Sequence, residues 1–131
     1  MAEQRQATSI QETEQAVKGY LHGHDTSGVA EDAVFVIMAT RQESKGRTAI
    51  DQLLDYFYNK AFTARFEQTD LVVGAGKAVV EGDFHGKQNM EFAGVKPRGK
   101  EVHVPLCIKY DVKNGKITRA NIYFETDALR M

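Results

Sequence analysis

The sequence has little that would mark an oxidising compartment or a charged partner: one cysteine, no surplus of either charge and no long apolar run. The single Cys107 excludes an internal disulfide, and its apolar neighbours favour burial as a small hydrophobic residue. Lys and Arg number 17 against 18 Asp and Glu, so no nucleic-acid surface is expected. No secretory signal or membrane span is recognised, which favours a cytoplasmic protein without a membrane partner.

Motifs of the common nucleotide- and ester-processing enzymes are also missing. No nucleophile-elbow, Walker or dinucleotide-binding pattern occurs, so nucleophile-elbow hydrolysis, nucleotide hydrolysis and dinucleotide redox chemistry have no support. His22, His24 and Asp25 lie close in sequence, but their spacing at a helix end does not place both imidazoles on one face. We interpret this segment as a solvated helix end and predict neither a metal site nor a cofactor.

What is present is the composition of one globular domain. The 131 residues are 42% hydrophobic and 27% charged, and a chain of this length buries a core without disulfides or metals. We predict a single domain over residues 1–131, with residues 1–7 as a flexible tail. Ser9 and Glu12 have the spacing of a capping box, which predicts a helix that presents Tyr20 to the core.

The rest of the chain predicts a second helix and a set of strands. Residues 33–39 are a continuous apolar run, typical of a strand that is buried on both faces. Apolar residues then recur at helical spacing over residues 48–62. Further strands are predicted, separated by Gly-rich or Asn-Gly turns, at Phe66 to Val73, Lys77 to about Phe92, Lys100 to Asp111 and Lys116 to Glu125. Asn114 and Gly115 predict a tight type I′ hairpin, and the order of elements indicates an α+β fold.

Four segments carry a resemblance to a known family: Y-L-H-G-H-D-T-S-G-V, E-D-A-V-F, G-R-T-A-I and the G-x-x-P-x-G-K pattern before the last hairpin. In this order the chain resembles the SnoaL-like branch of the nuclear-transport-factor-2-like superfamily, over about residues 10–130. The resemblance implies a conical barrel in which a strongly curved, mixed and mostly antiparallel sheet surrounds a pocket closed by N-terminal helices, commonly as a homodimer. The superfamily includes ketosteroid isomerases, polyketide cyclases, limonene epoxide hydrolases and members of unknown activity.

The resemblance also implies where catalytic residues would lie. Ketosteroid isomerases use a Tyr on the first helix and acids on the first and penultimate strands. The Tyr corresponds to Tyr20, while the two acid positions fall near Ile37 or Met38 and on Cys107. The acid of cyclases and epoxide hydrolases falls at or beside Ile122. Apolar or thiol side chains in these places argue against the known reactions, because a base must lie within hydrogen-bond reach of its proton.

This assignment depends on strand register. A slip of one residue would turn Asn121, Tyr123 and Glu125 toward the pocket and make Glu125 a candidate base. We favour the register that turns Ile122 and Phe124 inward, because the sheet face beneath the helices should be the more hydrophobic one.

Two strand histidines are further candidates for a catalytic base. His103 has the same parity as Cys107 and so could reach the pocket as a base, but a half-exposed strand histidine is the interpretation we favour. His85 shares its face with Asp83, which could orient it, and a solvent-facing pair is equally open. Gly86 suggests a bulge that would change the parity beyond it.

The leading hypothesis is a SnoaL-like protein of uncertain activity that binds a small, largely apolar molecule in a closed cavity. Tyr20 could donate a hydrogen bond to a ligand carbonyl, or be an ordinary core residue. A weak isomerase or cyclase would use His103, His85 and Tyr20. The predicted lining is Tyr20, Met38, Phe57, Phe66, Met90, Cys107, Ile122 and Phe124. The alternative is a non-catalytic association module whose outer sheet face pairs with a second copy.

Overall fold

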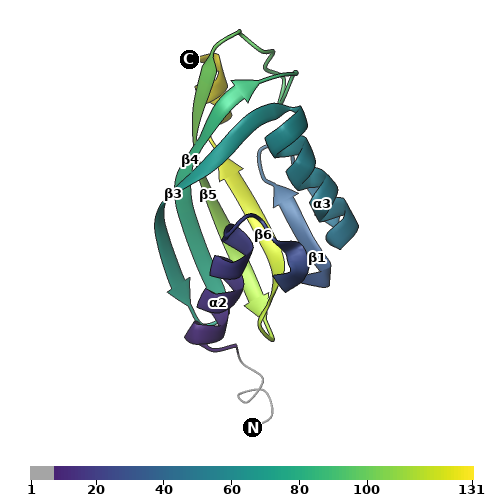
Figure 1. Cartoon of the computed structure of the whole chain (residues 1–131), viewed down its shortest axis with the longest axis vertical. Coiled ribbons are helices and arrows are strands. Elements are labelled where there is room, and N and C mark those ends of the chain that lie inside the picture. The colour runs from purple at the N-terminus through teal and green to yellow at the C-terminus, as the bar shows by residue number, and fades with distance from the viewer. Residues whose placement is uncertain (1–7) are drawn as a thin grey trace.

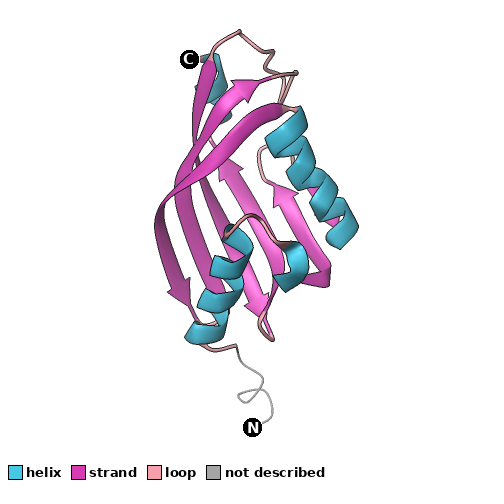
Figure 2. Ribbon diagram, viewed as in Figure 1, coloured by secondary structure: helices cyan, strands magenta, loops and turns pink. Residues whose placement is uncertain are grey.

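The computed structural model describes residues 8–131, in which two helices lie against one face of a six-stranded sheet (Figure 1). The predicted tail, residues 1–7, lies outside the described residues. In chain order the elements are α2 (Ile10–Leu21), η1 (Thr26–Gly28), β1 (Val29–Ile37), β2 (Gln42–Lys45), α3 (Arg47–Asp55), η2 (Tyr56–Lys60), β3 (Phe62–Gly74), β4 (Lys77–Gln88), β5 (Glu101–Lys113), β6 (Lys116–Phe124) and η3 (Thr126–Arg130). The predicted α+β class is confirmed, and Figure 2 shows the helices and strands that compose it.

The sheet is mixed and mostly antiparallel, as predicted, but it does not form a barrel. Its strand order is β2-β1-β6-β5-β4-β3, and only the β1 and β6 pair is parallel. Within the described residues β2 and β3 remain the two edges, so the sheet is neither closed nor strongly curled. The predicted conical barrel is therefore wrong, and one reason is length: β2 has 4 residues whereas β3 has 13. Closing the barrel would require the edge strands β2 and β3 to pair, and the short β2 cannot pair along the length of β3.

Helix α2 begins at the predicted capping box. The Glu12 backbone N–H donates to the Ser9 hydroxyl at 3.0 Å, and the Ser9 backbone N–H donates to the Glu12 carboxylate at 3.0 Å. This reciprocal pair satisfies two of the amides that a helix start leaves free. Thr13, which is fully buried, accepts a hydrogen bond from the Gly76 N–H at 2.8 Å and so ties α2 to the turn between β3 and β4.

The second helix is shorter than predicted and ends in a wider turn. Helix α3 covers Arg47–Asp55 and continues as the π-helical turn η2, in which the Ala61 N–H donates to the Tyr56 carbonyl oxygen at 2.7 Å. A π turn holds one more residue per hydrogen-bonded ring than an α turn. As a result two consecutive residues, Phe57 and Tyr58, both face the interior, and Phe62 begins β3 instead of ending the helix.

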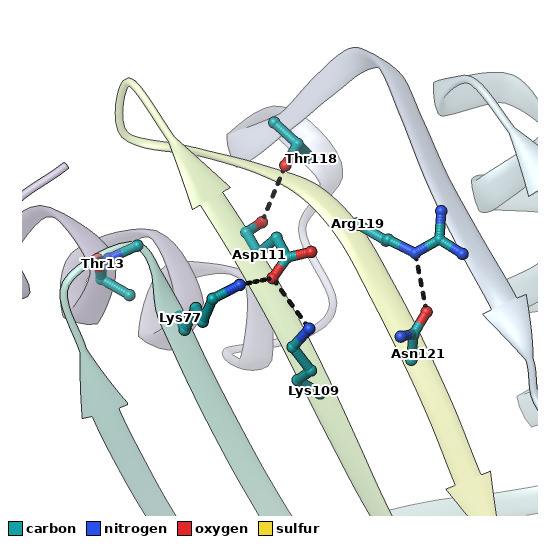
Figure 3. Close-up of polar contacts among 8 residues, drawn as sticks. Thr13, Lys77, Lys109, Asp111, Thr118, Arg119 and Asn121 are labelled. Carbon is teal, nitrogen blue, oxygen red and sulfur yellow. Dashed lines mark hydrogen bonds and ion pairs between the residues drawn. The ribbon is translucent and has the colours of Figure 1, made fainter. Parts of the chain in front are cut away.

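The last hairpin contains a bulge that the sequence did not indicate. Asn114 (φ 54°) and Gly115 (φ 74°) have the positive φ angles of the predicted tight turn. Beyond the turn, Val112 pairs with Ile117 but Asp111 pairs with Arg119, so Thr118 is an extra residue on β6. Figure 3 shows the Thr118 hydroxyl donating to the Asp111 carbonyl oxygen at 3.3 Å, which closes the bulge.

The bulge decides which residues face the helices. Cys107 pairs with Tyr123 and lies on the outer face, whereas a regular ladder counted from the turn would place it opposite Ile122. Ile122 is buried, as predicted, and Tyr123 is exposed on the outer face. The predicted inward position of Cys107 is therefore wrong. The bulge that Gly86 suggested is also not found in the described strands, because the β4–β5 ladder runs through it in one register.

Candidate functional site

A cavity lies between the helices and the inner face of the sheet. Most of its lining is aliphatic or aromatic, and its polar side chains gather near the end of α2. The lining residues are Tyr20, His24, Leu53, Leu54, Phe57, Tyr58, Phe62, Phe84, Val104, Leu106, Ile108, Ile122, Phe124 and Leu129. The volume open to the centre of a water-sized sphere is about 40 Å³. One water needs roughly 10–15 Å³ on this measure, so the cavity holds a molecule of only a few heavy atoms without side-chain movement.

Aromatic rings form the wall of the cavity next to η2. The Phe57 ring contacts four other phenylalanine rings, with centroid distances of 5.3 to 6.3 Å. Two of these pairs, those with Phe84 and Phe124, are edge-to-face, an arrangement that the ring quadrupole favours. This packing holds Phe57 in place between α3 and the sheet, so the apolar wall is preorganised.

Three side chains form the polar part of the lining, and we call them the Tyr20–His24–Tyr58 cluster. The His24 ring meets the Tyr20 ring edge-on with centroids 5.4 Å apart, and it lies 4.7 Å from the Tyr58 ring. The Tyr58 hydroxyl lies 3.4 Å from His24 Nε2, a long hydrogen bond whose donor depends on the histidine tautomer. The cluster therefore offers hydroxyl and imidazole groups at one end of an otherwise apolar space.

The chain reverses sharply after α2 to bring His24 into this cluster. Gly23 (φ 77°) and His24 (φ 55°) both have left-handed backbone conformations, which cost little for glycine and are tolerated by histidine. His22 points to solvent, and the Asp25 carboxylate accepts a hydrogen bond from the Ser27 N–H at 2.9 Å. The prediction of a solvated helix end is thus correct for His22 and Asp25 and wrong for His24.

The cluster is uncharged near neutral pH. Burial lowers the pKa of His24 from its usual 6.5, so its imidazole is neutral at pH 7. Burial also raises the pKa of Tyr20 and of Tyr58, and both therefore keep their hydroxyl protons. A neutral imidazole beside two phenols can donate and accept hydrogen bonds, and the imidazole can also accept a proton.

A third tyrosine lies behind the cluster. The Tyr110 side chain on β5 is fully buried, and its ring meets the Tyr20 ring at a centroid distance of 5.9 Å. Its hydroxyl has no hydrogen-bond partner among residues 8–131. Burial and the nearby Tyr58 raise the pKa of Tyr110, so this hydroxyl is a buried neutral donor. An unpaired buried donor costs free energy, which a polar group nearby would recover.

No carboxylate of the described residues lines the cavity. Ile37 is buried, Met38 faces a hollow on the outer side of the sheet, and Ile122 contributes to the cavity wall. Glu125 follows β6, is exposed, and lies in the same outer hollow as Met38. The positions that the resemblance assigned to acids are therefore apolar or outside the cavity, and the alternative register that would bring Glu125 inward is not the one found.

Four of the eight residues predicted to line a pocket lie along this cavity. Tyr20, Phe57, Ile122 and Phe124 line the cavity. Phe66 is on the inner face of the sheet, but its ring lies over Gly82. Met38 and Cys107 belong to the outer hollow, and Met90 is exposed beyond the end of β4. His24 and Tyr58 were not expected in the lining, and no sequence pattern marks them: His24 lies beyond the end of α2, where the chain reverses, and Tyr58 comes from η2.

The two strand histidines point away from the cavity. On the inner face Phe84 pairs with Val104, so their neighbours His85 and His103 pair on the outer face. Asp83 shares that face, as predicted. His103 does not reach the cavity and cannot be its base, which agrees with the favoured interpretation of an exposed strand histidine. It lies on the outer face with Cys107, because alternate residues of β5 share a face.

The α+β fold with a helix-covered, mostly apolar cavity is that of the ketosteroid isomerase-like proteins. Within this class the chain belongs to the SnoaL-like domain family, whose model matches residues 26–120. The resemblance stated from sequence is confirmed. No curated protein matches the sequence. Among residues 8–131, none of the helices combines the length and apolar character that crossing a membrane requires.

Solved structures share the fold at low sequence identity. A candidate SnoaL-like polyketide cyclase from Jannaschia sp. CCS1 is 15% identical, with a TM-score of 0.74 over 92% of both chains. A protein of ketosteroid isomerase-like fold from Catenulispora acidiphila DSM 44928, in complex with trimethylamine, is 14% identical, with a TM-score of 0.73 over 89% of this chain and 90% of that one. A candidate SnoaL-like polyketide cyclase from Shewanella putrefaciens CN-32 is 20% identical, with a TM-score of 0.70 over 92% and 93%.

Proposed function

We propose that this protein binds a small, largely apolar molecule in the cavity and holds one polar atom of it at the Tyr20–His24–Tyr58 cluster. The observation that carries the proposal is the single uncharged polar cluster in a cavity that is otherwise aliphatic and aromatic. Ligand sites typically combine an apolar wall with a few polar groups that fix orientation. A ketone, alcohol or ether of a few heavy atoms fits this combination.

Size separates this ligand from the larger molecules associated with the fold. The 40 Å³ of open space is far below what a steroid or a polycyclic polyketide occupies, so such a ligand would require the aromatic wall to move. A structural neighbour crystallised with trimethylamine supports the idea that this fold accepts molecules of a few heavy atoms. We therefore expect affinity to fall as ligand volume rises.

The enzymatic form of the proposal is proton transfer. His24, neutral at pH 7, would accept a proton from a carbon next to a ligand carbonyl, and Tyr20 would donate a hydrogen bond to the carbonyl oxygen. In this form His24 replaces His85 and His103, which lie on the other side of the sheet. The candidate polyketide cyclases among the structural neighbours support an activity of this class for the fold.

A pair of matched ligands tests the binding proposal. Butanone and 2-methyl-1-butene have the same shape and five heavy atoms each, but only the ketone accepts hydrogen bonds, so we expect the ketone to bind more tightly in calorimetric or NMR titration. Tyr20→Phe should weaken ketone binding about fivefold, the effect of one lost hydrogen bond, and leave the alkene unaffected. Tyr123→Phe on the outer face is the control. Equal affinities of the wild-type protein for both ligands, or no binding of either, would contradict the proposal.

A second candidate function is self-association through the outer face of the sheet. Tyr123 is 45% exposed there, beside Cys107 and Met38 in a shallow hollow. The same face carries both Lys77 and Asp111, so two copies related by a two-fold axis could pair opposite charges. Light scattering at micromolar concentration should then give the mass of a dimer and Tyr123→Glu that of a monomer. A monomeric wild-type protein would contradict this candidate.

A further inference from the structure

The outer face of the sheet holds a pair of histidines that the cavity does not use. His85 on β4 and His103 on β5 are direct cross-strand partners, and their Nδ1 atoms lie 2.8 Å apart. The two rings are nearly perpendicular, with centroids 4.8 Å apart. The His85 side chain is only 14% exposed, whereas that of His103 is 62% exposed, so one imidazole is fixed by packing and the other is free to adjust.

Acidic side chains lie at the opposite ends of both rings. His85 Nε2 is 3.7 Å from a Glu67 carboxylate oxygen, and His103 Nε2 is 3.4 Å from a Glu101 carboxylate oxygen. The two Nδ1 atoms are within hydrogen-bond distance, so without a metal one ring donates its Nδ1 proton to the other. His85 Nε2 is buried and has no hydrogen-bond partner among the described residues. A metal ion could replace the shared proton, because an imidazole nitrogen binds a metal through the same lone pair.

We propose that His85 and His103 bind one divalent transition-metal ion through their Nδ1 atoms. Imidazole is a preferred ligand of Zn²⁺, Ni²⁺ and Cu²⁺, and a carboxylate at the second ring nitrogen is the usual support for a metal-bound histidine. Glu101 belongs to the same group of side chains, since one ligand atom each of His85, Glu101 and His103 lies within 4.8 Å of the others. The site is separate from the cavity, so it stands or falls independently of the binding proposal.

The distance between the nitrogens is close to that of a metal complex. Two nitrogens bound to one ion at about 2.1 Å lie about 3.4 Å apart in a tetrahedral site and about 3.0 Å apart at a right angle. The observed 2.8 Å is about 0.2 Å shorter than the right-angled case. A movement of the exposed His103 ring by about 0.6 Å would provide the tetrahedral one.

Charges of both signs surround the histidine pair, so the imidazole ligands, and not the net local charge, should determine which metal ion binds. Arg65 is the cross-strand partner of His85, and Lys87 is the partner of Glu101, so both cations oppose a bound metal. Lys100 lines the adjacent hollow and acts in the same sense. Glu67, Asp83 and Glu101 favour the metal. Because Mg²⁺ and Ca²⁺ need several oxygen ligands, this mixed field should not hold them.

Calorimetric titration of tag-free protein with Zn²⁺ tests the site. We expect one equivalent to bind to the wild-type protein, and Co²⁺ to give a visible absorption spectrum that reports its coordination. His103→Ala should weaken binding at least about tenfold, and Glu101→Gln should weaken it less. His22→Ala is the matched control, because His22 is an exposed histidine outside the cluster, and it should leave the affinity unchanged.

The outcomes separate a metal site from incidental binding. His103 is exposed, so its substitution should leave the fold intact, and circular dichroism of each variant checks this directly. His103→Gln provides a second test that retains a polar side chain. The proposal is overturned if the wild-type protein binds no equivalent of Zn²⁺, if Mg²⁺ binds equally well, or if folded His103→Ala and His22→Ala bind Zn²⁺ with equal affinity.

Discussion

The two faces of the sheet differ more than any other two regions of this molecule, although they are built from the same strands. On β4 and β5, Phe84 and Val104 pair over the cavity, while the adjacent His85 and His103 pair on the outside. The pleat alone separates the two pairs. Which chemistry faces the cavity is therefore decided by a single step in register.

The faces also differ in how they handle polar groups. The inner face places its polar atoms in one neutral cluster under α2, where burial keeps His24 uncharged. The outer face carries ion pairs: the Asp111 carboxylate lies 3.0 Å from Lys77 Nζ and 3.4 Å from Lys109 Nζ (Figure 3). Neutral hydrogen-bonding groups suit a ligand cavity, whereas exposed charged pairs mainly provide solubility and surface recognition.

The largest expected difference between the faces is in packing. Phe57→Ala removes the ring that contacts four other phenylalanines and should lower the free energy of unfolding by about 3–5 kcal/mol. Tyr123→Ala on the outer face should change it by about 0.5 kcal/mol or less. Urea denaturation of both variants measures this difference. Similar losses in the two variants would show that the outer face is packed as tightly as the inner one, contrary to the comparison.

A smaller loss is expected when volume is added to the inner face. A Cβ atom at Gly82 would clash with the Glu67 carbonyl oxygen and with the Phe66 ring. Gly82→Ala should therefore lower the free energy of unfolding by about 1–3 kcal/mol. Gly19→Ala is the control: its Cβ meets nothing within 4 Å, and a helical alanine should stabilise by about 0.5–1 kcal/mol. Equal stability of the two variants in thermal or urea unfolding would refute the close approach at Gly82.

The pH dependence of stability provides a third and smaller difference. Burial lowers the pKa of His24 in the folded chain, so near and below pH 6.5 the unfolded chain binds more protons than the folded one. The free energy of unfolding therefore decreases as the pH is lowered through this range. Between pH 7.5 and 5.5, His24→Phe should lose part of this fall, as measured by urea midpoints. A wild-type protein and a His24→Phe variant with the same pH dependence would show that His24 is not held neutral by burial.

Asp111 on the outer face is the control for that experiment. Burial alone would raise the pKa of Asp111, but hydrogen bonds and charges from Lys109 and Lys77 lower it overall from 3.8. Its contribution to stability is present above about pH 3.8 and is lost only as the pH falls through the lowered value. Asp111→Asn should therefore leave the change between pH 7.5 and 5.5 as it is in the wild-type protein.

Local signals predicted the elements of the fold well. The capping box at Ser9 and Glu12, and the tight turn at Asn114 and Gly115, act over a few residues and are found as expected. The curvature and closure of the sheet depend on how long its edge strands are and on what packs against them. No short segment encodes this property, and the short β2 left the sheet open.

The candidate site was predicted less well because one inserted residue changed the parity of a whole strand pair. Thr118 bulges out of β6 without a glycine or proline to mark it, so counting from the turn placed Cys107 on the wrong face. His24 was missed for a different reason. Its neighbour Gly23 turns the chain back toward the helix, and the partner Tyr58 is 34 residues away, so only the tertiary structure brings the cluster together.

NMR that resolves the signals of the four imidazoles during a titration with butanone tests the central claim most directly, because each face of the sheet has its own histidines. We predict that the signals of His24 shift with saturating behaviour while those of His85 and His103 remain in place. Shifts confined to His85 and His103, with His24 unchanged, would contradict the account.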